Sequence, residues 1–114
     1  LPMRSHKDRE LLLSILEAKD FIALYVTNEC SHFTRERAII FELVTIGEAV
    51  NHLSKTLKDR YPEVAWRLIS DARNRMVHDY DNISSKIIWD IVNVHLPTLV
   101  THVQNILSQL QGQP

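Results

Sequence analysis

The sequence predicts an all-α protein, an up-down antiparallel helical bundle of four to five helices, from three observations. The 114 residues include only two glycines, so there is little of the turn chemistry that β-hairpins need. No segment sustains the period-two alternation of a half-buried strand. Apolar residues make up 45% of the chain, enough for a core at this length, so a single domain over 1–114 is expected.

The first two helices are predicted from apolar residues spaced three, four or seven apart. The first should run over about Ser5–Val26, and its stripe includes Leu12, Ile15, Leu16, Ala23 and Val26. A polar stretch then breaks the pattern, and Thr34 is predicted to cap the second helix. The second stripe comprises Ile39, Leu43, Ile46, Val50, Leu53 and Leu57. Gly47 lies beside it at a cost of about 1 kcal/mol relative to alanine, which predicts close packing of another helix there.

Two prolines divide the rest of the chain. Pro62 disfavours helix at the preceding residue, so the third helix should cover about Glu63–Asp79. A fourth helix should start near Ile87, be kinked or split at Pro97 and continue through Leu110. Three candidates for its cap are Asn82, Ser84 and Ser85. Residues 111–114 are expected to be a disordered tail, and residues 1–2 to be a cloning remnant or to precede an internal start at Met3.

The charge distribution and the single cysteine limit the possible classes of protein. The net charge is −1, but residues 55–75 hold six basic and three acidic side chains, either a solvated helix face or a local site for an anion. Cys30 cannot form a disulfide within the chain, which fits a reducing compartment such as the cytoplasm. No apolar run exceeds the six residues 21–26, and no secretion signal is recognisable. A membrane protein is therefore not expected.

Arg73 lies within the apolar stripe of the third helix, seven residues from both Trp66 and Tyr80. A guanidinium stays charged in a protein, so its burial requires partners. Three explanations are open. Arg73 could pair with a carboxylate such as Glu42 or Glu48, extend along the stripe to solvent, or line a cleft where a ligand or a second subunit supplies the anion.

His78 follows on the same helix, but about 140° around it from Arg73. Asn74 is four residues earlier and could hydrogen-bond the imidazole. Either the helix loosens before His78, or a second copy of the chain completes a site. The six histidines show no metal-binding spacing, and no cysteine cluster occurs, so no metal and no cofactor are expected.

The stretch RNRMVHDY (73–80) resembles the Arg-polar-x-x-x-His motif of HEPN-domain ribonucleases, in the His-x-Tyr form of HepT-like toxins. Four further segments resemble landmarks of that family in the same order: TIGEAVNHLS (45–54), RYPEVAWRLI (60–69), IIWDIV (87–92) and LPTL (96–99). The resemblance covers roughly residues 3–107. Asp71 and Ala72 depart from the Gly-Met-like pair that usually precedes the motif, and Asp71 could pair with Arg67 or Arg75.

The resemblance implies a homodimer with Arg73 and His78 of each subunit as catalytic residues in a shared cleft, cleaving RNA without a metal. It also implies a toxin of a type II/VII-like toxin–antitoxin pair. Its partner would be an MNT-type nucleotidyltransferase that adenylylates Tyr80.

The residue types suit that chemistry. His78 can act as acid or base near neutral pH, and Arg73 offers a permanent charge to a phosphate. Asn74 would support them, and Arg67 and Arg75 are candidate RNA-binding residues. Two other hypotheses are a non-catalytic dimeric scaffold that binds a nucleotide or the nucleotidyltransferase, and a purely structural dimer with Arg73 in a buried ion pair.

Overall fold

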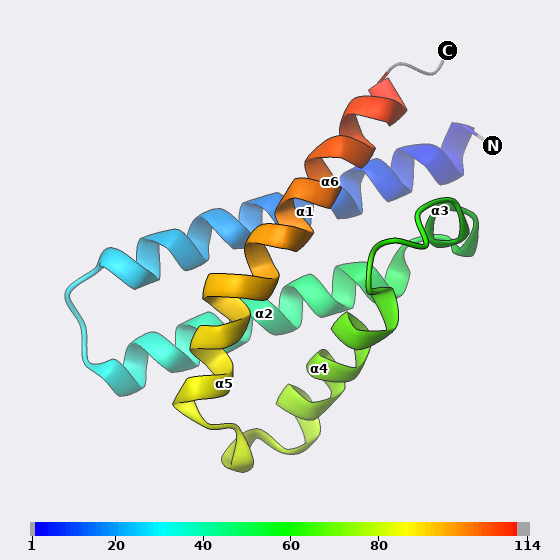
Figure 1. Cartoon of the computed structure of the whole chain (residues 1–114). Coiled ribbons are helices and arrows are strands. Elements are labelled where there is room, and N and C mark those ends of the chain that lie inside the picture. The colour runs from blue at the N-terminus through cyan, green and yellow to red at the C-terminus, as the bar shows by residue number, and fades with distance from the viewer. Residues whose placement is uncertain (1, 112–114) are drawn as a thin grey trace.

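The computed structural model describes the backbone of residues 2–111 and the side chains of residues 7–111. Every regular element in this part of the chain is helical, which confirms the all-α prediction (Figure 1). The elements are α1 (Pro2–Thr27), α2 (His32–His52), α3 (Lys55–Arg60), α4 (Trp66–His78), a 3₁₀ turn (Tyr80–Asn82), α5 (Ser85–Asp90), a π-helical segment (Ile91–His95) and α6 (Leu96–Gln111). None of these described helices has the length and apolar character needed to cross a membrane.

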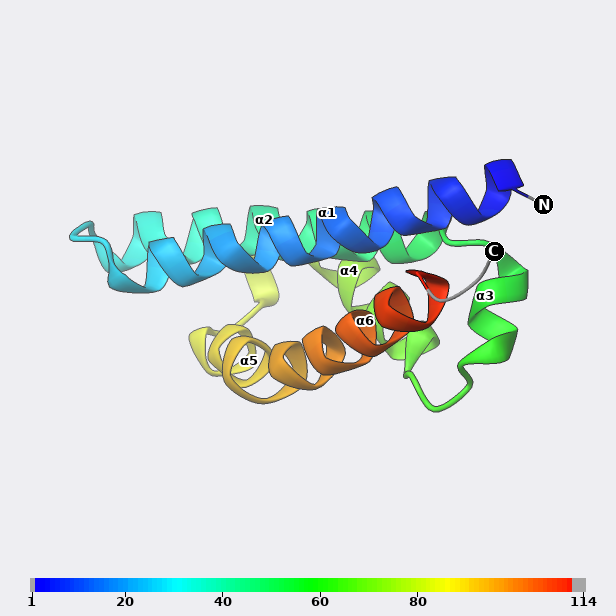
Figure 2. The ribbon, with the colours of Figure 1, turned by 90° about the horizontal axis from the view of Figure 1, so that it is seen from above.

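The helices form two layers (Figure 2). One layer is the antiparallel hairpin of α1 and α2, and the other contains α4 and the long helix made by α5 and α6. In the contacts between layers, α4 packs on α2 and α6 packs on α1. The core lies between the layers and includes the fully buried side chains of Leu12, Ile15, Ile39, Val50 and Val103.

Ser31, rather than the predicted Thr34, caps α2. Its hydroxyl oxygen accepts a hydrogen bond from the backbone N–H of Thr34 at 3.1 Å, which satisfies a free donor of the first turn. Arg35 then closes the hairpin by donating to the carbonyl oxygens of Tyr25 and Asn28 near the end of α1. Thr34 therefore lies inside the first turn that the serine begins.

The second stripe does not run on to Leu57 as one helix, because the chain turns at Leu53 and Ser54. Ser54 has an extended backbone and caps the separate helix α3, with its hydroxyl oxygen accepting from the N–H of Leu57. Its own N–H and hydroxyl donate to the two carboxylate oxygens of Asp8, at 2.8 and 2.6 Å. Asp8 is buried, so this contact between α1 and the turn satisfies a charge that would otherwise be costly.

α4 begins at Trp66, three residues later than predicted, and ends at His78, one residue earlier. Residues 61–65 form turns instead, and Tyr61 and Val64 are buried there. The Tyr61 hydroxyl donates to the side chain of Gln109 on α6, and the indole N–H of Trp66 donates to the Tyr61 carbonyl at 3.0 Å. These contacts hold residues 61–65 against the core in a non-helical conformation, so α4 starts only at Trp66.

The last helix is joined from α5, the π-helical segment and α6, as the prediction of a kinked or split helix required. Ser84, one of the three candidate caps, accepts from the N–H of Ile87, and the helix begins at Ser85 rather than near Ile87. Pro97 is the second residue of α6, two residues after the end of the π-helical segment. Its ring lacks an N–H and crowds the preceding turn, so wider hydrogen bonding just before it is the expected adjustment. Gln111 is the last helical residue, and residues 1 and 112–114 lie outside the described part of the chain.

Candidate functional site

Arg73 lies at a close contact between α4 and α2. A Cβ atom added to Gly47 would lie only 2.3 Å from the Cβ and 2.6 Å from the Cγ of Arg73. Real side chains do not approach so closely, and the prediction that Gly47 admits another helix is therefore confirmed. The absence of a side chain at Gly47 allows the aliphatic part of Arg73 to rest on the α2 backbone.

The guanidinium of Arg73 pairs with the carboxylate of Glu48, the residue after that glycine. The Arg73 Nη2 atom donates to Glu48 Oε1, and the two side chains are 22% and 43% exposed. Of the three explanations open from the sequence, the structure shows a carboxylate partner, and it is Glu48 rather than Glu42. The exposed fraction of Glu48 places the pair at the edge of the α2–α4 contact, within reach of solvent.

Asn74 contacts Arg73 rather than His78. Its side-chain oxygen accepts from Arg73 Nη1 at 3.0 Å, in place of the contact with the imidazole that its spacing suggested. Arg73 Nε is buried and has no hydrogen-bond partner among the described residues. Arg73 is therefore held through both terminal nitrogens, while its Nε–H has no partner among the described residues.

His78 is the last residue of α4 and is exposed. The helix stays regular up to it, so the local loosening that would turn its ring towards Arg73 does not occur. In the described part of the chain, no hydrogen bond or ion pair involves its imidazole. One copy of the chain thus does not bring Arg73 and His78 into a single site.

Tyr80 begins the 3₁₀ turn after α4 and is half-buried. Its ring faces Arg37 of α2, whose Cζ lies 5.4 Å from the ring centre and 5.2 Å from the centre of the Phe33 ring. Such cation–π contacts favour a guanidinium stacked between two aromatic faces. Sequence reasoning missed Arg37. The only local signal was its i,i+4 spacing from Phe33, which many surface helices share.

Arg67 and Arg75, the candidate RNA-binding residues, are exposed on α4. Neither forms an ion pair with Asp71 in the described structure. Helical spacing puts both on the side of α4 that carries His78, away from Arg73. They extend the basic character of that face but contact neither Arg73 nor Glu48.

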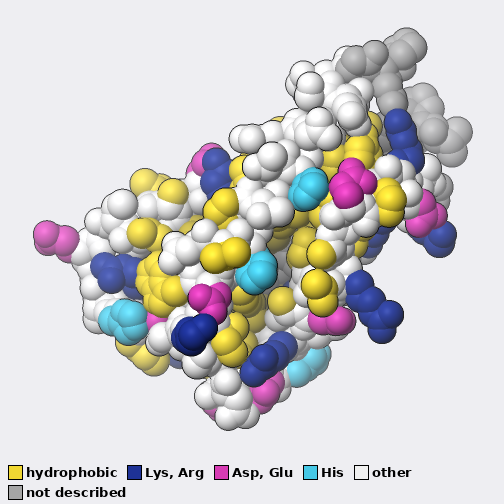
Figure 3. Space-filling model, in the orientation of Figure 1, with side chains coloured by type: hydrophobic (Ala, Val, Ile, Leu, Met, Phe, Trp, Pro, Cys, Tyr) yellow, Lys and Arg dark blue, Asp and Glu magenta, His cyan; other side chains and the backbone are white. Residues whose placement is uncertain are grey.

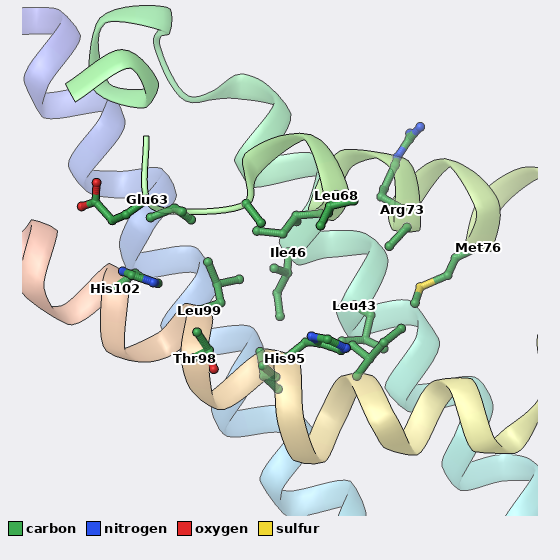
Figure 4. A pocket seen from close by; sticks show the side chains of 16 residues that line it. Leu43, Ile46, Glu63, Leu68, Arg73, Met76, His95, Thr98, Leu99 and His102 are labelled. Carbon is green, nitrogen blue, oxygen red and sulfur yellow. The ribbon is translucent and has the colours of Figure 1, made fainter. Parts of the chain in front are cut away.

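A groove of about 410 Å³ lies between α4 and α6, on a different side of α4 from Arg67, Arg75 and His78. Mostly apolar side chains line it, among them Leu43, Ile46, Met76 and Leu99. Hydrophobic side chains gather between these helices on the molecular surface in Figure 3. In Figure 4, Met76 and His95 point into the groove, whereas the guanidinium of Arg73 points away from it. Arg73 therefore lines the groove with part of its side chain, while its guanidinium turns away from the groove and pairs with Glu48.

Metal-binding clusters are absent among the described side chains, since no group of three or more histidine, cysteine, aspartate or glutamate side chains could hold an ion. The polar elements of the site are then an arginine, a glutamate, an asparagine, a nearby tyrosine and an exposed histidine. An arginine suits a phosphate, and a histidine near solvent suits proton transfer.

Comparisons with known proteins agree on a ribonuclease family. Residues 9–106 match the family model described as Ribonuclease HepT-like. A protein of Methanocaldococcus jannaschii named "Putative RNase MJ0127" is 32% identical over 110 residues, 92% of this chain and 91% of its own. A protein of Thermococcus cleftensis named "Probable ribonuclease HepT" is 31% identical over 101 residues, 84% of this chain and 90% of its own. No solved structure shows significant similarity. The chain therefore belongs to the HepT-like ribonuclease family.

Proposed function

We propose that this protein is a metal-independent endoribonuclease in which Arg73 and His78 are the catalytic residues. The observation that carries the proposal is the placement of Arg73, a guanidinium held at the protein surface by Glu48 and Asn74 within a HepT-like chain. A fixed, partly exposed arginine is suited to a phosphate whose charge grows during the reaction.

RNA supplies its own nucleophile, the 2′-hydroxyl. Cleavage requires that this hydroxyl lose its proton, that the 5′-oxygen leaving group gain one, and that the charge on the phosphorane be stabilised. An imidazole can exchange protons near neutral pH, so His78 serves as base or acid. Arg73 stabilises the phosphorane through its planar donor groups.

A homodimer would bring these two residues together. Arg73 and His78 lie on different faces of a regular helix, so a second copy is needed to supply the missing side chain. Phe41 and Val77, one or two helical turns from Glu48 and Arg73, are 68% and 43% exposed. Apolar side chains exposed beside a polar site fit an interface between subunits.

The protein would act as the toxin of a type II/VII-like toxin–antitoxin pair in the cytoplasm. Its partner would be an MNT-type nucleotidyltransferase that adenylylates Tyr80. The location of Tyr80 supports this regulation, because the tyrosine lies two residues after the end of α4 and its ring contacts Arg37, which could pair with an added phosphate. Peptide mass spectrometry after co-expression with the neighbouring gene product should find an adenylate on Tyr80. An unmodified Tyr80 in an inhibited complex would remove this part of the proposal.

The ribonuclease proposal is tested by cleavage of varied RNAs by the purified protein in the presence of EDTA. Cleavage should persist with the chelator and disappear in His78→Ala and in Arg73→Ala. The same variants should melt near the wild-type temperature, because His78 is exposed and Arg73 lies at the edge of the core. Undiminished cleavage by His78→Ala would disprove the role of that histidine.

The alternative is a non-catalytic dimeric scaffold that binds a nucleotide or the nucleotidyltransferase. The net charge of −1 favours it, since proteins that bind RNA strongly usually carry a basic surface. A dimer that binds AMP or its partner but leaves every RNA intact would establish this alternative. Loss of stability without loss of any activity in Arg73→Ala would instead indicate a purely structural ion pair.

A further inference from the structure

Glu48 forms an ion pair with Arg73, the proposed catalytic arginine. Its carboxylate binds Arg73 Nη2 from the neighbouring helix, while Asn74 binds Nη1 from the same helix. The aliphatic part of Arg73 rests on Gly47, one residue before Glu48. Two adjacent residues of α2 therefore position Arg73: Gly47 makes room for its Cβ and Cγ atoms, and Glu48 binds its guanidinium.

Such support matters because a free arginine side chain carries about 2 kcal/mol of rotamer entropy. A guanidinium already fixed before RNA arrives loses little of it on binding, and a small displacement of a catalytic group can cost about 100-fold in rate. One N–H on each of Nη1 and Nη2 remains after the contacts with Asn74 and Glu48. These are the donors that a phosphate would meet.

A carboxylate beside a phosphate-binding arginine has a second effect. Glu48 is partly exposed, and its negative charge offsets part of the Arg73 charge and repels an approaching phosphate. Glu48 would therefore weaken RNA binding through its charge, while it fixes the position of the guanidinium through its hydrogen bond. An acceptor that held Arg73 without a charge would relieve this repulsion.

We propose that Glu48 is a positioning residue for catalysis, which holds Arg73 by accepting from Nη2 and leaves the remaining Nη donors for the scissile phosphate. The inference rests on the proposed ribonuclease function. In this role Glu48 exchanges no proton with RNA and acts on the reaction only through the guanidinium that its Oε1 atom holds. Removing its charge while keeping its acceptor oxygen should therefore preserve catalysis.

The test compares Glu48→Gln with Glu48→Ala by kcat and KM for RNA cleavage. Glutamine keeps an oxygen acceptor at the same reach, so kcat should stay within about threefold of wild type and KM should fall. Alanine removes the contact, and kcat should fall by about tenfold or more. The pH profile of Glu48→Gln should keep the wild-type shape, since a positioning carboxylate takes no part in proton transfer. Glu29→Gln, on the exposed loop between α1 and α2, removes the same charge remotely and should change neither parameter.

Three outcomes would overturn the inference. Wild-type kcat in Glu48→Ala would show that Arg73 needs no positioning. An equal loss of kcat in Glu48→Gln and Glu48→Ala, or loss of the acidic limb of the pH profile in Glu48→Gln, would show that the carboxylate itself does the chemistry. Should Glu48→Ala fail to fold, Glu48→Asp shortens the reach by one methylene and should also lower kcat, and wild-type kcat there would count against positioning.

A measurement without RNA separates this inference from the proposed function. Nitrogen NMR of the Arg73 guanidinium should show restrained Nη groups in wild type and Glu48→Gln, and averaged signals in Glu48→Ala. If wild type cleaves no RNA but these spectra differ as expected, the ribonuclease proposal fails while Glu48 still holds Arg73. If wild type cleaves RNA but the spectra are identical, the positioning role fails alone.

Discussion

Gly47 and Arg73 are in contact where α4 packs on α2, and the Arg73 side chain fills the space that a side chain at position 47 would need. A glycine inside a helix costs about 1 kcal/mol relative to alanine. Here the missing side chain makes room for the Cβ and Cγ of Arg73, which would otherwise overlap with it. The glycine lowers the helix propensity of α2, but the space that it leaves allows the Arg73 guanidinium to reach Glu48.

Gly47→Ala is expected to destabilise the protein by up to about 2 kcal/mol, since overpacking costs about 1–3 kcal/mol and alanine regains about 1 kcal/mol of helix propensity. It should also lower RNA cleavage, because α4 must shift and carry Arg73 with it. Urea denaturation and a cleavage assay check both effects. The control is Ala23→Gly on an exposed position of α1, which measures helix propensity without a neighbouring helix. Stabilisation by Gly47→Ala would contradict the close contact.

Glu42 is a second charged residue of α2 with an unusual environment. It is 7% exposed, and burial, followed by repulsion from Glu17, raises the pKa of its carboxyl above the ordinary 4.5. The folded state thus favours the protonated form. That contribution to stability is complete below the ordinary pKa and is lost as the pH rises through the raised value.

Glu42→Gln should therefore increase the free energy of unfolding at neutral pH, with little gain below pH 4.5, where the native carboxyl is protonated. Denaturation curves at the two pH values measure the difference. Glu17→Gln, at an exposed position, should give a smaller gain in the same direction, because it removes only the repulsion. An unchanged or lower stability of Glu42→Gln at neutral pH would show that the charged form is not penalised.

At the scale of elements, three helices begin with the same device. Ser31, Ser54 and Ser84 each accept a hydrogen bond from the N–H three residues on, at the starts of α2, α3 and α5. Ser54 differs because the buried carboxylate of Asp8 also binds it from α1. That contact ties the beginning of the chain to the turn between α2 and α3.

Ser54→Ala should consequently destabilise the protein more than Ser84→Ala. The cap alone is worth about 1 kcal/mol in both. Ser54→Ala also leaves an oxygen of Asp8 without its hydroxyl partner, and an unsatisfied buried acceptor costs about 1–3 kcal/mol more. Chemical denaturation of the two variants gives the comparison directly. Equal losses would mean that water replaces the serine hydroxyl at Asp8.

At the scale of the whole molecule, α4 packs on α2, one of the two helices of the α1–α2 layer (Figure 2). Arg73 faces α2, whereas His78 is exposed at the end of the same regular helix. A rigid helix keeps that separation, so the proposed catalysis by Arg73 and His78 together calls for a second copy of the chain.

Mixed dimers test this arrangement. Arg73→Ala and His78→Ala should each be inactive alone, but a heterodimer purified through two different tags should regain part of the wild-type activity. It keeps one arginine and one histidine, contributed by different subunits. The matched control is a tagged homodimer of each variant handled in the same way. Activity no higher than in these homodimers would contradict a site shared in this form.

The sequence alone was sufficient for the helices, the purpose of Gly47, the interruption near Pro97 and the family. These depend on local signals, namely apolar periodicity, proline and glycine chemistry, and ordered motifs. Local signals were less precise at ends of helices, where the cap of α2 moved from Thr34 to Ser31 and α3 separated at Ser54. At Ser54 the break between the helices is accompanied by a contact with Asp8, a partner 46 residues away that local signals do not reveal.

Only the tertiary structure decided which groups meet Arg73. Glu42 and Glu48 lie on one helix and were equal candidates by spacing, but the packing of α4 turns the guanidinium towards Glu48. The contact of Arg37 with Tyr80 and the direction of the Arg73 guanidinium, away from the α4–α6 groove, likewise follow from how the helices cross. Periodicity fixes which face of a helix is buried. Which side chain stands opposite depends on the crossing and rotation of a second helix, and that is set by the packing of the whole core.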